Sequence, residues 1–313
     1  MIRILVTGGA GNIASALIAR LAANPAHHIT IADNLLTGDM RKVPLHLHNV
    51  QFIKCNVNDY NDIAPLFFAN NFEYVFHFAA VVGVQRTLQN PLWVMHDIHG
   101  IEHVLNLSKN TGVRRVYYSS SSEVYGEPFE IPQNEHTTPL NSRLPYAIVK
   151  NVGEAFLRTY HKEFGLNYLI FRFFNTYGPN QSEDFVVPRF IRQAMENRDI
   201  TIYGDGSQTR TFCYVDDNVE ACMNAHLTGK IENDTINIGS DVEFTIRELA
   251  ELVIEITGSK SNIIHLPPLT EGDMTRRKPD IGKMRTLLNR DMVPLETGIG
   301  RLLEHFREQD RSA

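Results

Sequence analysis

The sequence predicts a doubly wound α/β fold, and three observations support that prediction. Short apolar runs rich in β-branched residues alternate with helix-length amphipathic segments through the first half of the chain. The apolar runs are continuous rather than alternating, which is typical of a parallel sheet covered by helices on both faces. A glycine-rich turn at residues 8–11 joins the first run to the first helix. Right-handed crossovers place the carboxyl ends of parallel strands along one edge, where we expect a binding crevice.

The expected elements of this first domain follow one another in a regular order. We predict strands at residues 2–6, 29–32, 50–53, 74–78, 116–119 and 168–173. We predict helices at 13–23 and at about 61–70, 91–110 and 146–164. This alternation is the pattern of repeated βαβ units.

A smaller C-terminal α/β domain is expected, because the rhythm becomes irregular after about residue 172. Helical patterns at 186–197 and 244–257 are separated by a turn at 204–208, and prolines gather at 266–268. We expect residues 1–172, together with about 211–240, to form the first domain. The second domain of this prediction comprises residues 173–210 and 241–313.

Composition disfavours several classes of protein. The 313 residues are 43% apolar and 21% charged, as in an ordinary globular protein. Thirty basic and 36 acidic side chains give a formal charge of -6, so no basic field favours a nucleic-acid partner. The apolar stretches are too short for a membrane span or a signal peptide, so we expect no membrane association. The three cysteines, Cys55, Cys213 and Cys222, form no C-x-x-C pair and favour a reducing cytoplasm.

The glycine-rich turn has the features of a dinucleotide-binding site. Thr-Gly-Gly-Ala-Gly-Asn-Ile-Ala, residues 7–14, follows the first strand directly and opens the first helix. Glycines allow a sharp turn and a close approach to a pyrophosphate, and the helix N-terminus offers N–H groups. A tight strand–helix turn without a ligand would show similar glycines, so further evidence is needed.

Asp33 supplies that evidence. It ends the second predicted strand, about twenty residues beyond the turn, where its carboxylate can accept hydrogen bonds from a ribose diol. A carboxylate there repels a 2′-phosphate, so the sequence favours NAD over NADP. The alternative is that Asp33 only caps a loop.

A second candidate site lies in Tyr146-Ala-Ile-Val-Lys150. This spacing places the phenol and the ammonium on one helix face. We expect the neighbouring cation, with a positively charged nicotinamide ring, to lower the pKa of Tyr146 so that its phenolate acts as a base. Hydroxyls and a carboxylate follow the fifth predicted strand in Ser119-Ser-Ser-Ser-Glu-Val-Tyr-Gly126. A solvated helix face and a polar loop are the structural alternatives.

Taken in order, these motifs resemble the extended short-chain dehydrogenase/reductase family, and within it the nucleotide-sugar epimerases, dehydratases and decarboxylases. The set comprises Thr-Gly-Gly-Ala-Gly, Asp33, His77-Phe-Ala-Ala80, Ser-Ser-Glu-Val-Tyr-Gly, Tyr146-x-x-x-Lys150, Arg172-Phe-Phe-Asn-Thr-Tyr-Gly-Pro179, Ile202-Tyr-Gly-Asp-Gly-Ser-Gln-Thr-Arg-Thr-Phe212 and Arg277-Lys-Pro-Asp-Ile281. The resemblance covers nearly the whole chain. It implies a Rossmann-type domain that binds NAD and a C-terminal domain that binds a nucleoside-diphosphate sugar, above all a UDP-sugar. It also implies a homodimer formed by the helices near 91–110 and 146–164.

The resemblance further implies that the sugar is oxidised at C4 to a transient ketone. Tyr146 takes the 4-hydroxyl proton while NAD accepts the hydride, Lys150 holds the nicotinamide ribose, and Ser121 hydrogen-bonds the 4-oxygen. The implied cofactor contacts are Gly8, Gly11, Asn12, Ile13, Asp33, Asn34, Asn56, Val57, Ala79 and Lys150. The implied substrate contacts are Ser122, Asn175, Tyr203, Arg210 and Arg277, of which the arginines suit a diphosphate. For Arg276 a surface ion pair is an equal alternative.

Position 123 bears on the fate of the 4-keto sugar. The family's 4-epimerases usually carry a small residue there, whereas its dehydratases and UDP-glucuronate decarboxylases carry Glu, as this chain does. Glu123 is suited to abstract the C5 proton or to orient a departing carboxylate. Ser122 offers no acid comparable to the Asp of the 4,6-dehydratases, yet the segment 79–86 resembles the epimerase and dehydratase form. We expect decarboxylation or dehydration, with 4-epimerisation as the alternative.

Four positions depart from the family pattern. Ala14 replaces the third glycine, Asn12 replaces an aromatic residue, Asn56 replaces an Asp that contacts the adenine amine, and Asp97 replaces an Asn. The amide oxygen of Asn56 can still accept the adenine hydrogen bond.

Two other classes of protein are disfavoured. Asp33 argues against an NADPH-dependent reductase, and the presence of both Tyr146 and Lys150 argues against a non-catalytic dinucleotide sensor. His99 and His103 share a predicted helix face, but the spacing indicates no third ligand, so we predict no metal site.

Overall fold

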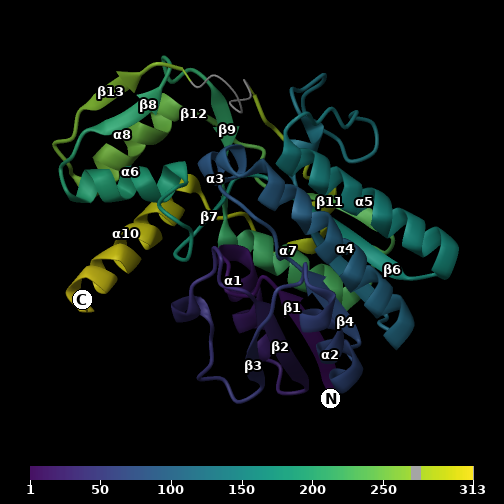
Figure 1. The fold of residues 1–313 in the computed structure, drawn as a ribbon. Helices are drawn as coiled ribbons and strands as arrows, with labels where there is room; N and C mark the ends of the chain where they lie inside the picture. The colour runs from purple at the N-terminus through teal and green to yellow at the C-terminus, as the bar shows by residue number, and fades with distance from the viewer. Residues whose placement is uncertain (269–275, 313) are drawn as a thin grey trace.

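A computed structural model describes residues 1–268 and 276–312 and confirms the doubly wound fold. Seven parallel strands form one sheet in the order β11-β6-β5-β4-β1-β2-β3 (Figure 1). The strands are β1 (Ile2–Thr7), β2 (His27–Asp33), β3 (Val50–Lys54), β4 (Tyr74–His77), β5 (Arg115–Ser121), β6 (Asn167–Phe173) and β11 (Asp234–Ile238). The strand order reverses beside β1, so the crevice expected of such a fold opens at the carboxyl ends of β1 and β4.

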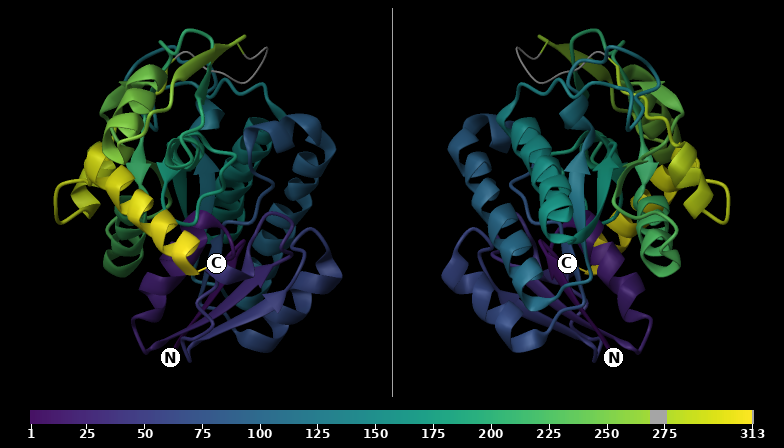
Figure 2. Two further views of the ribbon diagram at one scale, coloured as in Figure 1. Left: turned by 90° about the vertical axis from the view of Figure 1, so that its left-hand side faces the viewer. Right: turned by 90° about the vertical axis from the view of Figure 1, so that its right-hand side faces the viewer.

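Helices cover both faces of this sheet. On one face lie α1 (Asn12–Ala22) and α7 (Val215–Thr228), and on the other lie α2 (Tyr60–Asn70), α4 (Pro91–Thr111) and α5 (Pro145–Phe164). Each face has its own apolar core, because successive side chains of a strand point to opposite sides. Ile4 and Val6 of β1 belong to the first core and Leu5 to the second. Figure 2 shows α4 and α5 side by side along one flank.

Prolines and glycines set the ends of the two longest helices near the site. Pro91 and Pro145 occupy the first turns of α4 and α5, where a missing N–H costs nothing. Gly112 and Gly165 follow the two helices with φ of 80° and 71°, a left-handed cap that glycine adopts without strain. Strand β5 runs two residues further than predicted, because Ser121 still pairs with β6 opposite Phe173.

The C-terminal lobe contains small sheets and three longer helices. Strand β8 (Ile200–Tyr203) pairs in parallel with β13 (Ile263–Leu266), and β9 (Thr209–Thr211) pairs antiparallel with β12 (Glu243–Thr245). The helices are α6 (Val186–Met195), α8 (Ile246–Thr257) and α10 (Leu295–Ser312). Helix α8 begins two residues later than predicted, because Thr245 caps it in a reciprocal pair of hydrogen bonds with Glu248.

Several short elements were not predicted, because they span too few residues to show a period. They include α3 (Val84–Gln89), α9 (Gly282–Leu287), the 3₁₀ turns η1 (Met40–Lys42) and η2 (Ser122–Tyr125), and the paired strands β7 (Thr176–Tyr177) and β10 (Cys213–Tyr214). The short strands β8, β9, β12 and β13 were missed for the same reason. Three longer elements, β11, α7 and α10, were also not predicted. Residues 269–275 and 313, part of the expected second domain, lie outside the described residues.

The close packing of α5 on β5 gives a prediction for stability. A Cβ atom at Gly153 would lie 2.2 Å from the hydroxyl oxygen of Tyr118, which is buried and has no room to move. We expect Gly153→Ala to lower the free energy of unfolding by about 1–3 kcal/mol, the usual cost of overpacking. In Gly300→Ala, on α10, the added methyl meets nothing within 4 Å, so this control should be neutral or more stable by up to about 1 kcal/mol. Urea unfolding measures both, and equal stabilities of the two variants would contradict this packing.

Candidate active site

The glycine-rich turn is pressed against the end of β4. Gly8 has a φ of 70°, and a Cβ atom there would lie 2.6 Å from the backbone of Ala79. Gly11 precedes α1, whose first turn contains no acidic residue and no side-chain cap. Asn12 contributes a buried Oδ1 without a hydrogen-bond partner among the described residues. Uncapped N–H groups, a glycine-lined approach and an orphaned polar atom are features that fit a bound pyrophosphate.

Asp33 lies buried at the end of β2 beside this turn. Its Oδ2 accepts a hydrogen bond from the N–H of Ala10 at 3.0 Å, and its Oδ1 accepts one from Leu35 at 2.8 Å. The carboxylate is therefore fixed in place, and each oxygen keeps a lone pair for a ribose hydroxyl. Asp33 therefore does cap the loop, as the alternative interpretation held. This contact still leaves its carboxylate able to bind a ribose.

The remaining cofactor candidates occupy the same edge. Ile13 packs on the first core, and Oδ1 of Asn34 accepts a hydrogen bond from Leu36. Oδ1 of Asn56 already accepts a hydrogen bond from Asn58 at 3.2 Å, so an adenine amine would share this oxygen. Val57 is buried, and its carbonyl oxygen contacts Nδ1 of His103 at 3.2 Å.

Tyr146 and Lys150 lie in the first turns of α5, facing the end of β5. Nζ of Lys150 donates a hydrogen bond to the carbonyl oxygen of Ser119 at 2.6 Å and lies 5.7 Å from the ring centre of Tyr146. Tyr146 also forms a hydrogen bond with Ser121. Three of the four predicted catalytic residues are therefore gathered around one strand end.

The pKa values of Tyr146 and Lys150 are shifted mainly by burial. Burial raises the pKa of Tyr146 above its usual range, and Glu123 and Asp97 act in the same direction, while Ser121 and Arg277 oppose them. Burial also lowers the pKa of Lys150 to about 8, and the charge of Asp97 opposes this shift. The predicted lowering of the Tyr146 pKa by its lysine is thus wrong for the protein groups alone, because desolvation outweighs it. A cationic ring beside the phenol would act in the predicted direction.

Asp97 joins two loops of the cofactor edge. Its Oδ2 accepts a hydrogen bond from the N–H of Val81 at 2.8 Å, and its Oδ1 accepts one from Nδ2 of Asn58 at 3.1 Å. Both partners are hydrogen-bond donors, and the carboxylate of Asp97 has one oxygen for each of them. The amide of an Asn at this position would offer only one acceptor oxygen. Sequence comparison flagged Asp97 as a departure but assigned it no role, because its partners lie on other segments.

His77 is a further residue that sequence reasoning left without a role. It is buried at the end of β4, where its Nδ1 lies 2.8 Å from the hydroxyl of Thr7. Burial lowers the pKa of His77 to about 3, so the ring is neutral. The hydroxyl of Thr7 also accepts a hydrogen bond from Ala79, at 3.3 Å. This contact fixes the ends of β1 and β4 relative to each other.

Glu123 and Arg277 form an ion pair across the crevice. Nη1 of Arg277 lies 2.7 Å from Oε1 of Glu123, and the two side chains are 6% and 19% exposed. Nε of Arg277 and Oε2 of Glu123 are buried without hydrogen-bond partners among the described residues. The pair thus presents a free donor and a free acceptor, which are features that a polar ligand would satisfy. Arg276 points elsewhere and forms the surface ion pair with Glu243 at 3.3 Å.

The other predicted substrate residues are more widely spread. Ser122 is buried at the start of η2. Asn175 adopts a φ of 34° and donates to the carbonyl of Thr211 at 2.9 Å. Tyr203 ends β8, and Arg210 lies in β9, where its Nη1 donates to its neighbouring carbonyl at 2.8 Å.

The described residues were predicted to contain no metal site and no membrane span. Within residues 1–268 and 276–312 no group of three or more His, Cys, Asp or Glu side chains is placed to hold a metal ion. The rings of His99 and His103 stack at 6.5 Å on α4. Over the same residues, no helix is long and apolar enough to cross a membrane.

The charge of Asp97 gives a prediction for Lys150. Because that charge raises the pKa of Lys150 against burial, Asp97→Asn should lower it below its value of about 8. The titration is measured by NMR of the labelled lysine side chains. Asp39→Asn, which removes a carboxylate paired with Arg41 on a surface loop, is the matched control and should leave Lys150 unchanged. An unchanged pKa in Asp97→Asn would show that the two groups are not electrostatically coupled.

The chain is similar to known proteins over nearly its whole length. Residues 4–239 match the model of the NAD dependent epimerase/dehydratase family. The chain is 35% identical to the UDP-N-acetyl-alpha-D-glucosaminuronate decarboxylase of Bacillus cytotoxicus, over 98% of each chain. It is 36% identical to UDP-glucuronic acid decarboxylase 6 of Arabidopsis thaliana, over 97% of this chain and 89% of that protein.

A solved structure is similar over the same length. The UDP-glucuronic acid 4-epimerase of Bacillus cereus, in complex with UDP-glucuronic acid and NAD, superposes with a TM-score of 0.89. The two chains are 30% identical, and the match covers 98% of this chain and 100% of that one. The chain therefore belongs to the NAD-dependent epimerase/dehydratase family of extended short-chain dehydrogenases/reductases, and it is an NAD-dependent enzyme.

Proposed function

We propose that this enzyme decarboxylates a UDP-linked uronic acid by way of a 4-keto sugar. The observation that carries the proposal is the Glu123–Arg277 ion pair, whose side chains are 19% and 6% exposed. Its Oε2 and Nε atoms have no hydrogen-bond partner in the part of the chain that the structure describes. Names of relatives support the same choice, since two similar proteins are decarboxylases and a similar structure holds UDP-glucuronic acid. Arg277 Nε is suited to the C6 carboxylate, and Glu123 Oε2 to a sugar hydroxyl.

The protein groups account for the proton steps. Bound NAD supplies the hydride acceptor for C4 and later returns the hydride. Tyr146 takes the proton of the 4-hydroxyl, assisted by the ammonium of Lys150, and Ser121 donates a hydrogen bond to the 4-oxygen. The C6 carboxylate is then β to a ketone, so the C5–C6 bond breaks, carbon dioxide leaves, and its electron pair forms an enolate over C5, C4 and the 4-oxygen. The protonated phenol of Tyr146 and the hydroxyl of Ser121 stabilise that negative oxygen until C5 takes a proton from water. When the hydride returns to C4, Tyr146 returns its proton to the 4-oxygen, so the reaction consumes one proton from solvent.

The second candidate is 4-epimerisation of the same kind of sugar. It is supported by the similarity to the UDP-glucuronic acid 4-epimerase of Bacillus cereus. Under this alternative the hydride returns to the opposite face of C4 and the carboxylate stays in place. Dehydration is less well supported, because Ser122 is buried and offers no acid for a leaving hydroxyl.

The proposal divides the chain between cofactor and substrate. We assign NAD to residues 1–172 and about 211–240, and the nucleotide sugar to 173–210 and 241–313. Asn175, Tyr203, Arg210 and Arg277 belong to the second group and are assigned to the sugar and its diphosphate. The location proposed is the cytoplasm, because all three cysteines are unpaired and buried.

We also propose that two copies of the chain associate through α4 and α5. Leu92, Trp93 and Met95 on α4 and Ile148 on α5 are large apolar side chains that are 37–72% exposed on these neighbouring helices. Two helices from each copy would form a four-helix bundle. We expect Trp93→Glu to convert a dimer into monomers in analytical ultracentrifugation. Phe68→Glu alters an aromatic residue on α2 that is 64% exposed, against 50% for Trp93, and as the control it should remain dimeric. Monomers in the unsubstituted protein would contradict the proposal.

The reaction is tested by its products. We expect the NAD-loaded enzyme to release carbon dioxide from UDP-glucuronate or UDP-N-acetylglucosaminuronate and to leave UDP-glucose unchanged, as measured by mass spectrometry. Tyr146→Phe should remove all product while NAD remains bound. A product of unchanged mass with a new sugar signature in NMR would establish 4-epimerisation instead.

The role of Glu123 is tested by removing its charge, with the removal of a charge from a second ion pair as the control. Glu123→Gln should slow carbon dioxide release by about 10²-fold or more, while NADH still forms from C4 oxidation. Glu123 holds the Arg277 that is assigned to the C6 carboxylate, and only the later step breaks the bond to that carboxylate. Glu73→Gln removes a carboxylate that pairs with Arg114 at 3.1 Å before the start of β4, and it should leave the rate unchanged. Normal carbon dioxide release by Glu123→Gln would remove this residue from the mechanism.

A further inference from the structure

The two halves of the Glu123–Arg277 pair come from segments that are joined at a single buried amide. Glu123 lies in η2, after β5, and Arg277 lies in the C-terminal part of the chain. The side chain of Asn237, on β11, is fully buried and contacts both segments. We propose that Asn237 is a positioning residue, which sets the separation of Glu123 and Arg277 for the carbon dioxide-releasing step. The inference rests on the function proposed above.

On one side, the amide nitrogen of Asn237 holds the segment that carries Arg277. Nδ2 donates to the carbonyl oxygen of Gln133 at 2.9 Å and to that of Asp280 at 3.2 Å. The same two stretches are linked by backbone hydrogen bonds from Gln133 to Lys278 at 2.7 Å and from Asp280 to Gln133 at 2.8 Å. Arg277 immediately precedes this linkage, so its backbone position depends on it.

On the other side, the amide oxygen of Asn237 holds the segment that carries Glu123. The hydroxyl of Tyr125, two residues beyond Glu123, donates to Oδ1 of Asn237 at 2.8 Å. That hydroxyl accepts a hydrogen bond from Nη1 of Arg172 at 2.7 Å. Because arginine only donates, the single proton of Tyr125 is free to go to Asn237, and this fixes which end of the amide faces Tyr125.

A buried ion pair anchors this chain of hydrogen bonds to the helix that carries Tyr146. Arg172 binds Glu154 of α5 through two bonds, Nε to Oε1 at 2.8 Å and Nη2 to Oε2 at 2.7 Å. Glu154 also accepts from the hydroxyl of Ser120 at 2.6 Å, next to Ser121. Burial alone would raise the pKa of Glu154, but Arg172 lowers it, so the carboxylate stays charged. The network therefore spans the strand end, η2 and the Arg277 segment.

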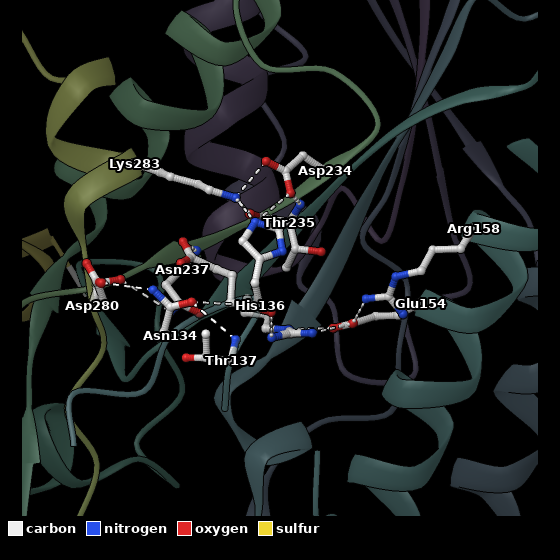
Figure 3. Close-up of polar contacts among 12 residues, drawn as sticks. Asn134, His136, Thr137, Glu154, Arg158, Asp234, Thr235, Asn237, Asp280 and Lys283 are labelled. Carbon is white, nitrogen blue, oxygen red and sulfur yellow. Dashed lines mark hydrogen bonds and ion pairs between the residues drawn. The ribbon is translucent and has the colours of Figure 1, made fainter. Parts of the chain in front are cut away.

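Figure 3 shows the outer part of this network around Asn237, where residues 134–137 lie between β11 and the segment near Asp280. Lys283 contacts Asp234 at 2.6 Å and His136 at 2.8 Å on this more exposed side. Lys283 joins α9 to β11 and to His136, and it touches neither Tyr125 nor the carbonyls that Asn237 binds. It therefore offers a control for a loss of stability alone.

Asn237→Asp and Tyr125→Phe test the proposal with minimal change of shape. Asp places an oxygen against two carbonyl oxygens, and Phe removes the hydroxyl that joins Arg172 to Asn237. We expect each to lower kcat for carbon dioxide release by about ten- to hundredfold, with KM for the UDP-uronate nearly unchanged and NADH accumulating from C4 oxidation. Lys283→Met should lower the melting temperature without changing kcat or the ratio of NADH to carbon dioxide. If Asn237→Asp does not fold, Tyr125→Phe carries the test.

Two results would overturn the inference. One is an unchanged ratio of NADH to carbon dioxide in a folded variant, and the other is an equal change of that ratio in Lys283→Met. A second readout does not depend on the reaction: hydrogen exchange in residues 122–126 and 276–280 should accelerate together in Asn237→Asp, but not in 122–126 of Lys283→Met. If the unsubstituted enzyme releases no carbon dioxide, the proposed function fails. The exchange result then still decides whether Asn237 joins the two segments.

Discussion

All seven strands of the main sheet run in the same direction, and the site depends on that constraint. Parallel strands end together, so their last backbone groups meet side chains and loops rather than a further strand. Each end near the site has such a partner: Lys150 binds the carbonyl of Ser119, Thr7 binds Ala79, and Asp97 binds Val81. Lys150, Thr7 and Asp97, which bind these groups, are all buried at the edge of the sheet where the crevice is expected. Structural and functional roles coincide at this edge, as Asp33 already shows.

The sequence predicts what depends on neighbours in the chain and misses what depends on distant ones. The alternation of strands and helices, the glycine turn and the Tyr146–Lys150 spacing are local patterns, and the structure contains each of them. The partner of Glu123 is not local, and no period in the sequence links it to Arg277. The rise in the pKa of Tyr146 that burial causes was missed for a related reason, because burial is a property of the packed fold rather than of a helix face. The lowering expected beside a nicotinamide ring stays a prediction. Asn237 has no motif of its own and becomes visible only through its contacts.

Charge is arranged in buried pairs around the crevice. Asp97 opposes the burial of Lys150, Arg172 opposes that of Glu154, and Arg277 is paired with Glu123. Buried ion pairs add little stability when compared with apolar replacements, yet removing one partner costs about 3–5 kcal/mol. Such pairs constrain geometry strongly, because the remaining charge has no alternative partner. The bidentate contact of Arg172 with Glu154 thus holds β6 and α5 in one register, and the active-site loop extends from that fixed point.

Under the proposed function, the Glu123–Arg277 pair would let the site distinguish a uronic acid from a hexose. By itself the pair is neutral, with one guanidinium edge occupied and Nε free. A C6 carboxylate can accept a charge-assisted hydrogen bond from that edge, whereas a hydroxymethyl group offers only a weaker, neutral acceptor. Binding the carboxylate places two anions on one cation, and loss of neutral carbon dioxide moves one negative charge from C6 to the 4-oxygen beside Tyr146 and Ser121. The site thereby disfavours the bound carboxylate and favours the enolate, which is differential stabilisation of the kind that catalysis requires.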